Sequence, residues 1–177
     1  MNDNLQIATF AGGCFWCTEA VFNRLKGVER VVSGYTGGHI KNPAYREICT
    51  GRTGHAEAIQ IFYNENIISY TELLEIFFAT HDPTTLNRQG NDIGPQYRSV
   101  IFYKNDEELK DVEEVIGYLQ QNFVDDIVTE VSPLINFFVA ENIHHNYFAN
   151  NPNNPYCSMV VGPKISKTRA KHASLYK

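Results

Sequence analysis

The chain has 177 residues, a formal net charge of -5, 43% hydrophobic residues and four cysteines. This length predicts a single domain, residues 1–177, with a core that needs no disulfide bonds. The negative charge argues against binding to nucleic acid or to an anionic membrane surface. No apolar run reaches the length of a membrane span, and the first four residues lack the features of a secretory signal. We therefore expect a cytoplasmic monomer with reduced thiols.

Predicted strands and helices alternate along most of the chain. Apolar or alternating segments predict strands over residues 5–10, 28–35, 56–63 and 99–103. Helices are expected between them: one that ends at about Lys26 before Gly27, a short one within 43–49, one capped by Ser69 and one capped by Asp106. The order strand, helix, strand, strand, helix, strand is a split βαβ pattern. It predicts an α+β fold: a two-layer, ferredoxin-like sandwich with a mostly antiparallel sheet and additional C-terminal segments.

Two further segments stand outside this pattern. Residues 81–98 are polar and turn-rich, and a loop of this length inside a compact domain is usually functional. The C-terminal region is basic, which predicts a solvated tail with Lys164, Lys167, Arg169, Lys171 and Lys177.

The sequence Gly13-Cys14-Phe15-Trp16-Cys17 is the strongest chemical signal. Glycines after a strand place Cys14 at a helix N-terminus, where free backbone N–H groups favour a thiolate. We expect its pKa to fall toward ~7, which would make Cys14 a nucleophile beside an apolar surface formed by Phe15 and Trp16. One alternative is a thioredoxin-like redox pair, although Phe-Trp is bulky for that role. The other is that Phe15 and Trp16 begin a core helix and Cys14 is simply buried.

Glu57 lies in the alternating segment 56–63 and shares a face with Ile59, Ile61 and Tyr63. Burial on that face would raise its pKa and make it a proton donor near pH 7. The alternative is a glutamate at the edge of the sheet, bonded to a backbone group or an arginine.

Several polar residues give weaker signals. Tyr45 and Tyr97 lie in loops that contain proline or glycine, and Asp92 lies in a turn. The six histidines lack a metal-type spacing, so no metal site is expected. A zinc site made by Cys14, Cys17 and distant histidines is the alternative.

Together these segments resemble the peptide methionine sulfoxide reductase A family. The similarity extends in order from about Phe10 to about Cys157, and its motifs are residues 13–16, 33–38, 43–47, 53–57, 81–84 and 87–99. The resemblance implies that Cys14 attacks the sulfur of methionine sulfoxide and becomes a sulfenic acid. It also implies selectivity for the S epimer, regeneration by thioredoxin and no bound cofactor. The expected substrates are oxidised proteins, peptides and the free amino acid.

The same resemblance assigns roles to the polar residues. Glu57 would protonate the sulfoxide oxygen, and Tyr45 and Tyr97 would donate hydrogen bonds to it. Phe15 and Trp16 would hold the S-methyl group. Asp92 would belong to the polar shell near the sulfur.

Recycling is where the chain departs from the family pattern. Many members have resolving cysteines in a glycine-rich tail; Cys157 occupies the first such position, but the apolar segment 158–164 follows it. If that segment is a buried strand, Cys157 is structural. Cys17 is the rival partner, although a disulfide across Phe-Trp would be strained. We favour Cys157 over Cys17, keep direct reduction by an external thiol as a third route, and expect Cys49 to pack in the core.

Two other functions stay open at this stage. A thioredoxin-like dithiol oxidoreductase would use Cys14 and Cys17. A redox or metal-binding module without enzymatic activity is the second.

Overall fold

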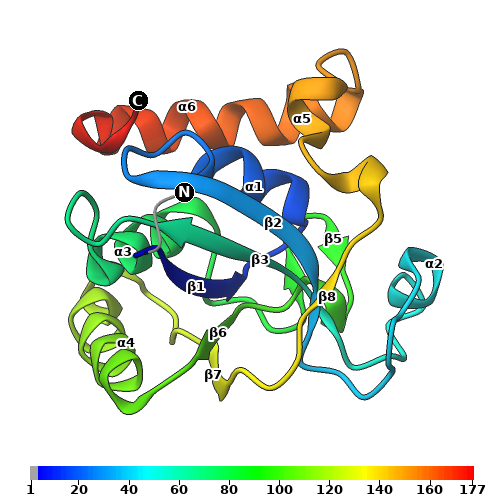
Figure 1. Ribbon diagram of the computed structural model, residues 1–177, viewed down its shortest axis with the longest axis horizontal. Helices are drawn as coiled ribbons and strands as arrows, with labels where there is room; N and C mark the ends of the chain where they lie inside the picture. Colours follow the sequence, from blue (N-terminus) through cyan, green and yellow to red (C-terminus); the bar gives the residue numbers. More distant parts are fainter. Residues whose placement is uncertain (1–3) are drawn as a thin grey trace.

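A computed structural model describes residues 4–177 and contains a six-stranded sheet in the order β7-β6-β1-β3-β2-β8 (Figure 1). Its strands are β1 (Gln6–Ala11), β2 (Val28–Thr36), β3 (Ala56–Tyr63), β6 (Val100–Tyr103), β7 (Glu130–Pro133) and β8 (Phe138–Val139). Neighbouring strands are antiparallel, except that β6 and β7 are parallel. All four predicted strands are confirmed to within one residue at each end. The fold is α+β, as expected.

Helices cover the face of the sheet that forms the main core (Figure 1). They are α1 (Phe15–Phe22), α2 (Tyr45–Ile48), α3 (Tyr70–Thr80), α4 (Asp106–Leu119), α5 (Tyr147–Asn150) and α6 (Gly162–Lys171). Phe10 of β1 packs against Phe22 of α1 and Phe77 of α3, with ring centroids 6.0 Å and 5.0 Å away. On the opposite face, Leu134 and Phe137 cover a smaller cluster of buried residues. Within residues 4–177, no helix has the length and apolar character needed to cross a bilayer.

Helix α1 ends earlier than predicted. It stops at Phe22 and not near Lys26, and the chain then makes tight turns in which Leu25 N–H donates to Phe22 O at 3.2 Å. The next N–H, that of Lys26, leaves the helix direction and donates to Leu175 O at 2.8 Å. Gly27 has φ +86° and completes this turn, so it does not cap the helix directly.

The segment 81–98 is only partly a loop. It contains a two-stranded hairpin, β4 (Arg88–Gln89) and β5 (Asp92–Ile93), followed by a 3-10 turn, η1 (Pro95–Tyr97). These strands are two residues long, which is too short for an alternating pattern to be visible in the sequence.

The strand considered for residues 158–164 is wrong. Cys157–Val161 forms a π-helical turn, η4, that continues directly into α6. A short apolar run does not distinguish a strand from a buried helical segment, and Pro163 is tolerated because it lies in the first turn of α6. The basic C-terminal residues therefore lie mostly on a helix and not on a solvated tail.

Helix α4 begins with a different cap from the one predicted. Asn105 is the N-cap, and its Oδ1 accepts a hydrogen bond from Glu108 N–H at 2.8 Å. Asp106 is the first helical residue. We expect Asn105→Ala to lower the free energy of unfolding by about 1 kcal/mol. Asp106→Ala, the matched control, should cost less in urea unfolding; an equal or larger loss for Asp106→Ala would contradict the assigned cap.

Candidate active site

A glycine pair brings Cys14 to the N-terminus of α1. Gly13 has φ +90°, and a Cβ there would lie 2.7 Å from the side chain of Gln89. A Cβ on Gly12 would lie 2.8 Å from the Phe77 ring. Only glycine fits this close approach. The loop thus ends with Cys14 as the N-cap of α1, as predicted from the sequence, with 8% of its surface exposed.

The predicted low pKa of Cys14 is wrong. Burial raises the pKa of this thiol well above its ordinary value, and the nearby charges of Glu57 and Cys17 raise it further. The backbone N–H of Trp16 lowers it but does not compensate. Loss of hydration therefore outweighs the helix N-terminus, and Cys14 is a protonated thiol in the resting protein.

Glu57 is the buried acid that its position in the strand predicted. It lies opposite Tyr35 in the β2–β3 register, and only 2% of its surface is exposed. Its Oε1 accepts a hydrogen bond from Phe15 N–H at 3.2 Å, which ties it to the first turn of α1. Burial raises the pKa of Glu57 to about 8, despite the opposing effect of that bond. At pH 7 this carboxyl group therefore retains its proton.

Two tyrosines and an aspartate complete the polar side of the site. Tyr45 and Tyr97 are half-buried, and burial together with the charge of Glu57 raises the pKa of both phenols. They are therefore hydrogen-bond donors at neutral pH. Asp92 accepts a hydrogen bond from Tyr156 Oη–H at 2.6 Å, and its charge raises the pKa of Cys14.

The aromatic pair after Cys14 divides between the core and the surface. Phe15 is fully buried, whereas Trp16 is half-buried. Trp16 Nε1–H donates to His144 Nδ1 at 3.2 Å. Tyr147 stacks on the indole with ring centroids 3.7 Å apart and planes 5° from parallel. The orientation of Trp16 is therefore fixed by residues far along the chain.

Sequence reasoning missed this contribution from residues 141–156. The carboxylate of Glu141 accepts from Tyr35 Oη–H at 3.1 Å and from Tyr45 N–H at 3.0 Å. Glu19, which is also buried, accepts from Ser33 Oγ–H at 2.7 Å and from the N–H of Asn146. These bonds link residues up to 127 positions apart, so no local spacing predicts them.

The four cysteines are all free thiols, and three are buried. Cys17 Sγ lies 3.8 Å from Tyr156 Oη. The buried thiols influence one another's ionisation. A charge on Cys17 raises the pKa of Cys14, and a charge on Cys157 raises the pKa of Cys17. Cys17 therefore lies within electrostatic reach of both other thiols. Among residues 4–177, no group of three or more His, Cys, Asp or Glu side chains is arranged to hold a metal ion.

Cys49 is exposed, so its expected place in the core is wrong. It follows the short helix α2 as its C-cap, and its thiol lies close enough to the Tyr45 hydroxyl to raise the pKa of that phenol. We expect one equivalent of iodoacetamide at neutral pH to label Cys49 first, because buried thiols react slowly. Peptide mapping by mass spectrometry checks this. Faster labelling of Cys14 than of Cys49 would contradict the burial and raised pKa described for Cys14.

Comparison with known proteins agrees with this geometry. The family model "Peptide methionine sulfoxide reductase" matches residues 6–176. The chain belongs to this family. A relative from Saccharolobus solfataricus, peptide methionine sulfoxide reductase MsrA, is 53% identical over 163 residues, which is 92% of each chain. The crystal structure of reduced Mxr1 from Saccharomyces cerevisiae superposes with a TM-score of 0.82 at 34% identity, covering 89% of this chain and 91% of Mxr1. A structure of Mxr1 in complex with Trx2 matches with a TM-score of 0.58 at 26% identity, covering 83% and 87%.

As a peptide methionine sulfoxide reductase, the protein is an oxidoreductase that reduces methionine sulfoxide with thiols. Cys14, Glu57, Tyr45 and Tyr97 lie within electrostatic reach of one another, because Glu57 raises the pKa of the other three groups.

Proposed function

We propose that this enzyme reduces the S epimer of methionine sulfoxide, in proteins, in peptides and as the free amino acid, through a sulfenic acid on Cys14. One observation supports this most directly. Glu57 is a buried carboxylic acid with a pKa of about 8 beside the Cys14 thiol. Sulfoxide oxygen is a poor leaving group until it is protonated, and an acid with this pKa supplies the proton at neutral pH.

The chemical step follows from these positions. Tyr45 and Tyr97 donate hydrogen bonds to the sulfoxide oxygen, and Trp16 with Phe15 holds the S-methyl group. Glu57 transfers its proton to the oxygen while the Cys14 sulfur attacks the substrate sulfur, and the proton of the thiol restores Glu57. In the adduct, the hydroxyl group then moves from the substrate sulfur to the Cys14 sulfur. The Cys14 sulfur–oxygen bond forms as the substrate sulfur–oxygen bond and the transient sulfur–sulfur bond break. Methionine leaves as the reduced product and Cys14 becomes the sulfenic acid.

The sequence favoured Cys157 over Cys17 as the resolving thiol. Because Cys17 lies within electrostatic reach of both Cys14 and Cys157, we propose instead that Cys17 acts first and Cys157 second. Cys17 attacks the sulfenic acid of Cys14, which forms a disulfide and releases water. Cys157 then attacks Cys17, which returns Cys14 to its thiol form and leaves a Cys17–Cys157 disulfide. Thioredoxin, as a dithiol, reduces that disulfide. The position of Cys17 within reach of both partners supports the order of attack, and the similar structure of Mxr1 with Trx2 supports the external reductant.

We also infer the setting in which the enzyme works. Residues 1–177 form one catalytic domain that acts as a cytoplasmic monomer, with no nucleic-acid or membrane partner. The four strands β6-β1-β3-β2 are paired antiparallel, with α1 after β1 and α3 after β3. This order supports a ferredoxin-like core.

Disulfide mapping after one equivalent of methionine-S-sulfoxide, without reductant, tests this proposal. In a Cys49→Ser background, the expected product is a Cys17–Cys157 disulfide. Cys157→Ser should stop at a Cys14–Cys17 disulfide, and Cys17→Ser should retain a sulfenic acid that dimedone traps. If Cys17→Ser forms a Cys14–Cys157 disulfide at the wild-type rate, Cys157 acts first and the proposed order is wrong.

A further inference from the structure

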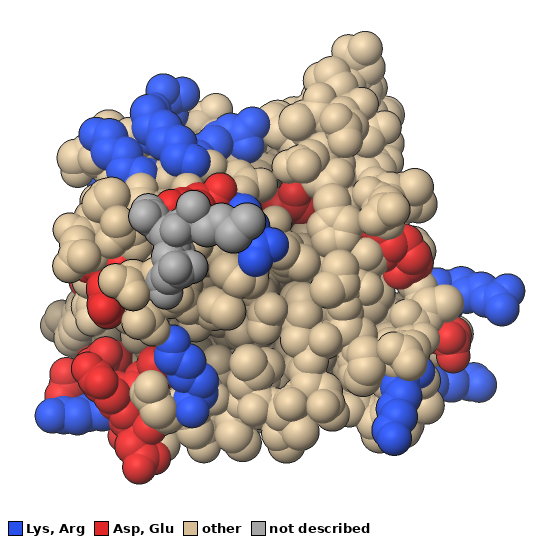
Figure 2. Space-filling model, viewed as in Figure 1, with Lys and Arg blue, Asp and Glu red and all other residues tan. Residues whose placement is uncertain are grey.

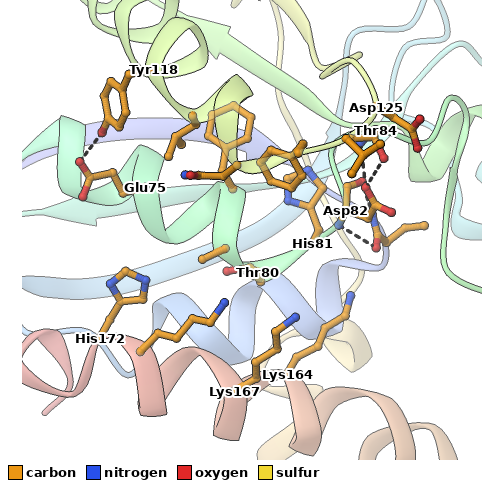
Figure 3. Close-up of a pocket in the computed structure, with 18 residues that line it drawn as sticks. Glu75, Thr80, His81, Asp82, Thr84, Tyr118, Asp125, Lys164, Lys167 and His172 are labelled. Atoms are coloured by element: carbon orange, nitrogen blue, oxygen red, sulfur yellow. Dashed lines mark hydrogen bonds between the residues drawn. The ribbon is translucent and has the colours of Figure 1, made fainter.

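A large groove lies outside the catalytic site, between α6 and the layer formed by α3 and the end of α4. Its volume is about 830 Å³, which is within the range of sites that hold a substantial ligand. In Figure 3, side chains from α6 point across this space toward α3 and the segment that follows it. The groove has two walls of different charge and an apolar floor.

The wall formed by α6 is basic. Lys164, Lys167 and Lys171 line the groove at a spacing that places them on one helix face, while Ile165 and Thr168 of the same helix are buried. Within residues 4–177, none of these three lysine side chains forms an ion pair or a hydrogen bond. In Figure 2, basic side chains gather over α6 although the chain as a whole has a net charge of -5. Three cations therefore face the groove without compensation.

Two of the three acids on the opposite wall already have hydrogen-bond donors. Asp82 accepts from Thr84 N–H at 2.9 Å and from Thr84 Oγ1–H at 2.6 Å, and Glu75 accepts from Tyr118 Oη–H. Asp125 is a third acid that lines the groove, on the loop after α4, and Figure 3 shows it on the opposite side of the groove from α6. Among residues 4–177, the three lysines and Asp125 are therefore the charged side chains of the groove that have no hydrogen-bond or ion-pair partner.

The floor between these walls is apolar. Phe78 is buried, Leu119 and Phe123 are half-buried, and Val124 at the rim is a fully exposed hydrophobic residue. An inorganic anion bound to the lysines would leave the apolar floor exposed to water. A polypeptide with carboxylates and a large apolar side chain would cover the floor and neutralise the lysines together.

We propose that this groove is the docking site for an acidic segment of a protein partner, with carboxylates on Lys164, Lys167 and Lys171 and an apolar side chain on Phe78, Leu119 and Phe123. The groove adjoins the loop Gly12–Gly13 that precedes Cys14. His81 and Gln89 line the groove, and they also contact the positions where Cβ atoms would lie on Gly12 and Gly13. A segment docked in the groove therefore does not cover Trp16, Tyr45 or Glu57, because none of these residues lines it.

Fluorescence anisotropy with a defined probe tests the docking site. The probe is a fluorescein-labelled peptide with six glutamates around one leucine and one phenylalanine. We expect saturable binding to the wild-type enzyme that weakens as salt rises. The variant Lys167→Glu/Lys171→Glu should bind about tenfold more weakly or worse. A matched control with the same net charge, Lys41→Glu/Lys110→Glu, should stay within about twofold of wild type, because it changes lysines on other surfaces.

Three further measurements decide the chemistry. A peptide with lysines in place of the glutamates should not bind, and an all-glutamate peptide should bind more weakly than the probe. Saturating probe should leave the reduction of N-acetyl-methionine sulfoxide by dithiothreitol unchanged, which separates this site from catalysis. Absence of saturable binding, an equal loss in the control variant, or inhibition of sulfoxide reduction by the probe would overturn the proposal.

Discussion

A Glu57→Gln variant should reduce methionine sulfoxide about 10²–10⁴-fold more slowly than the wild-type enzyme at pH 7, the usual contribution of a general acid. Glutamine retains the size of the side chain and an oxygen that can accept from Phe15 N–H, so the first turn of α1 stays in place. What it removes is the proton, which burial holds on the carboxyl group up to a pH of about 8. Steady-state rates with dithiothreitol as reductant measure the loss.

A matched control separates chemistry from structure. Glu108 is also a buried glutamate with a pKa raised by burial, but it lies on α4 and accepts from Lys104 N–H at 2.8 Å. Glu108→Gln should leave the rate near the wild-type value. Cys14 of Glu57→Gln should still react with iodoacetamide in the native protein at about the wild-type rate at pH 7, because Glu57 is protonated and uncharged at that pH. Equal losses of thiol reactivity and of turnover would argue against an acid role.

The proton on Glu57 also predicts how the activity of the wild-type enzyme changes with pH. Glu57 is an effective acid below a pH of about 8 and loses its proton above it, so wild-type activity should fall as the pH rises through that value. Stability should follow a related trend. Because the folded pKa of Glu57 is raised, the folded state binds a proton that the unfolded state has lost, and unfolding free energy decreases from the ordinary carboxyl pKa up to about 8. Glu57→Gln should lack this decrease, which urea unfolding at pH 5 and pH 7 measures.

Much of the fold was predictable because its strands have clear patterns. The segment 56–63 has a period-two pattern, and the structure buries Ile59 and Ile61 in the main core with Glu57 buried in the same strand, although Ala56 and Ala58 on the other face are buried as well. Helix ends were less predictable: α1 ends at Phe22, and the chain after it is held by a bond from Lys26 N–H to Leu175 O, a residue near the C-terminus. The prediction for the segment after Cys157 was wrong for a different reason: its three apolar residues, Met159, Val160 and Val161, fit a strand as well as a helical turn.

In the site, too, the features set by neighbouring residues were predictable and those set by distant residues were not. Cys14 and Glu57 were identified from their immediate neighbours, the glycines and the alternating strand. The pKa of Cys14 was not, because it depends on how deeply the folded protein buries the thiol and on Glu57, 43 positions away. Glu141 and His144 hold Tyr45 and Trp16 through bonds across 96 and 128 positions, which no sequence spacing indicates.

Cys14→Ser should abolish turnover of methionine-S-sulfoxide altogether, the largest effect expected from a single substitution in this protein. A serine hydroxyl at this buried position is a far weaker nucleophile than a thiol, and it cannot form the sulfenic acid or the disulfides that follow. Cys49→Ser, which also removes one thiol, should retain activity within a few-fold of wild type because Cys49 is exposed and outside the proposed relay. Assays with the two sulfoxide epimers kept separate measure the effect, and undiminished turnover of the S epimer by Cys14→Ser would overturn the assigned nucleophile.

Single-turnover measurements then separate attack from recycling. Without reductant, Cys17→Ser should still release one equivalent of methionine per enzyme, because Cys14 attacks before any second thiol is needed. Cys14→Ser should release none, although its Cys17 and Cys157 are unchanged. A thioredoxin-like exchange through Cys14 and Cys17 requires both thiols and would make the two variants equally inactive. The contrast between them therefore tests whether Cys14 acts alone on the substrate, with Glu57 as its acid, and whether Cys17 enters only after methionine has left.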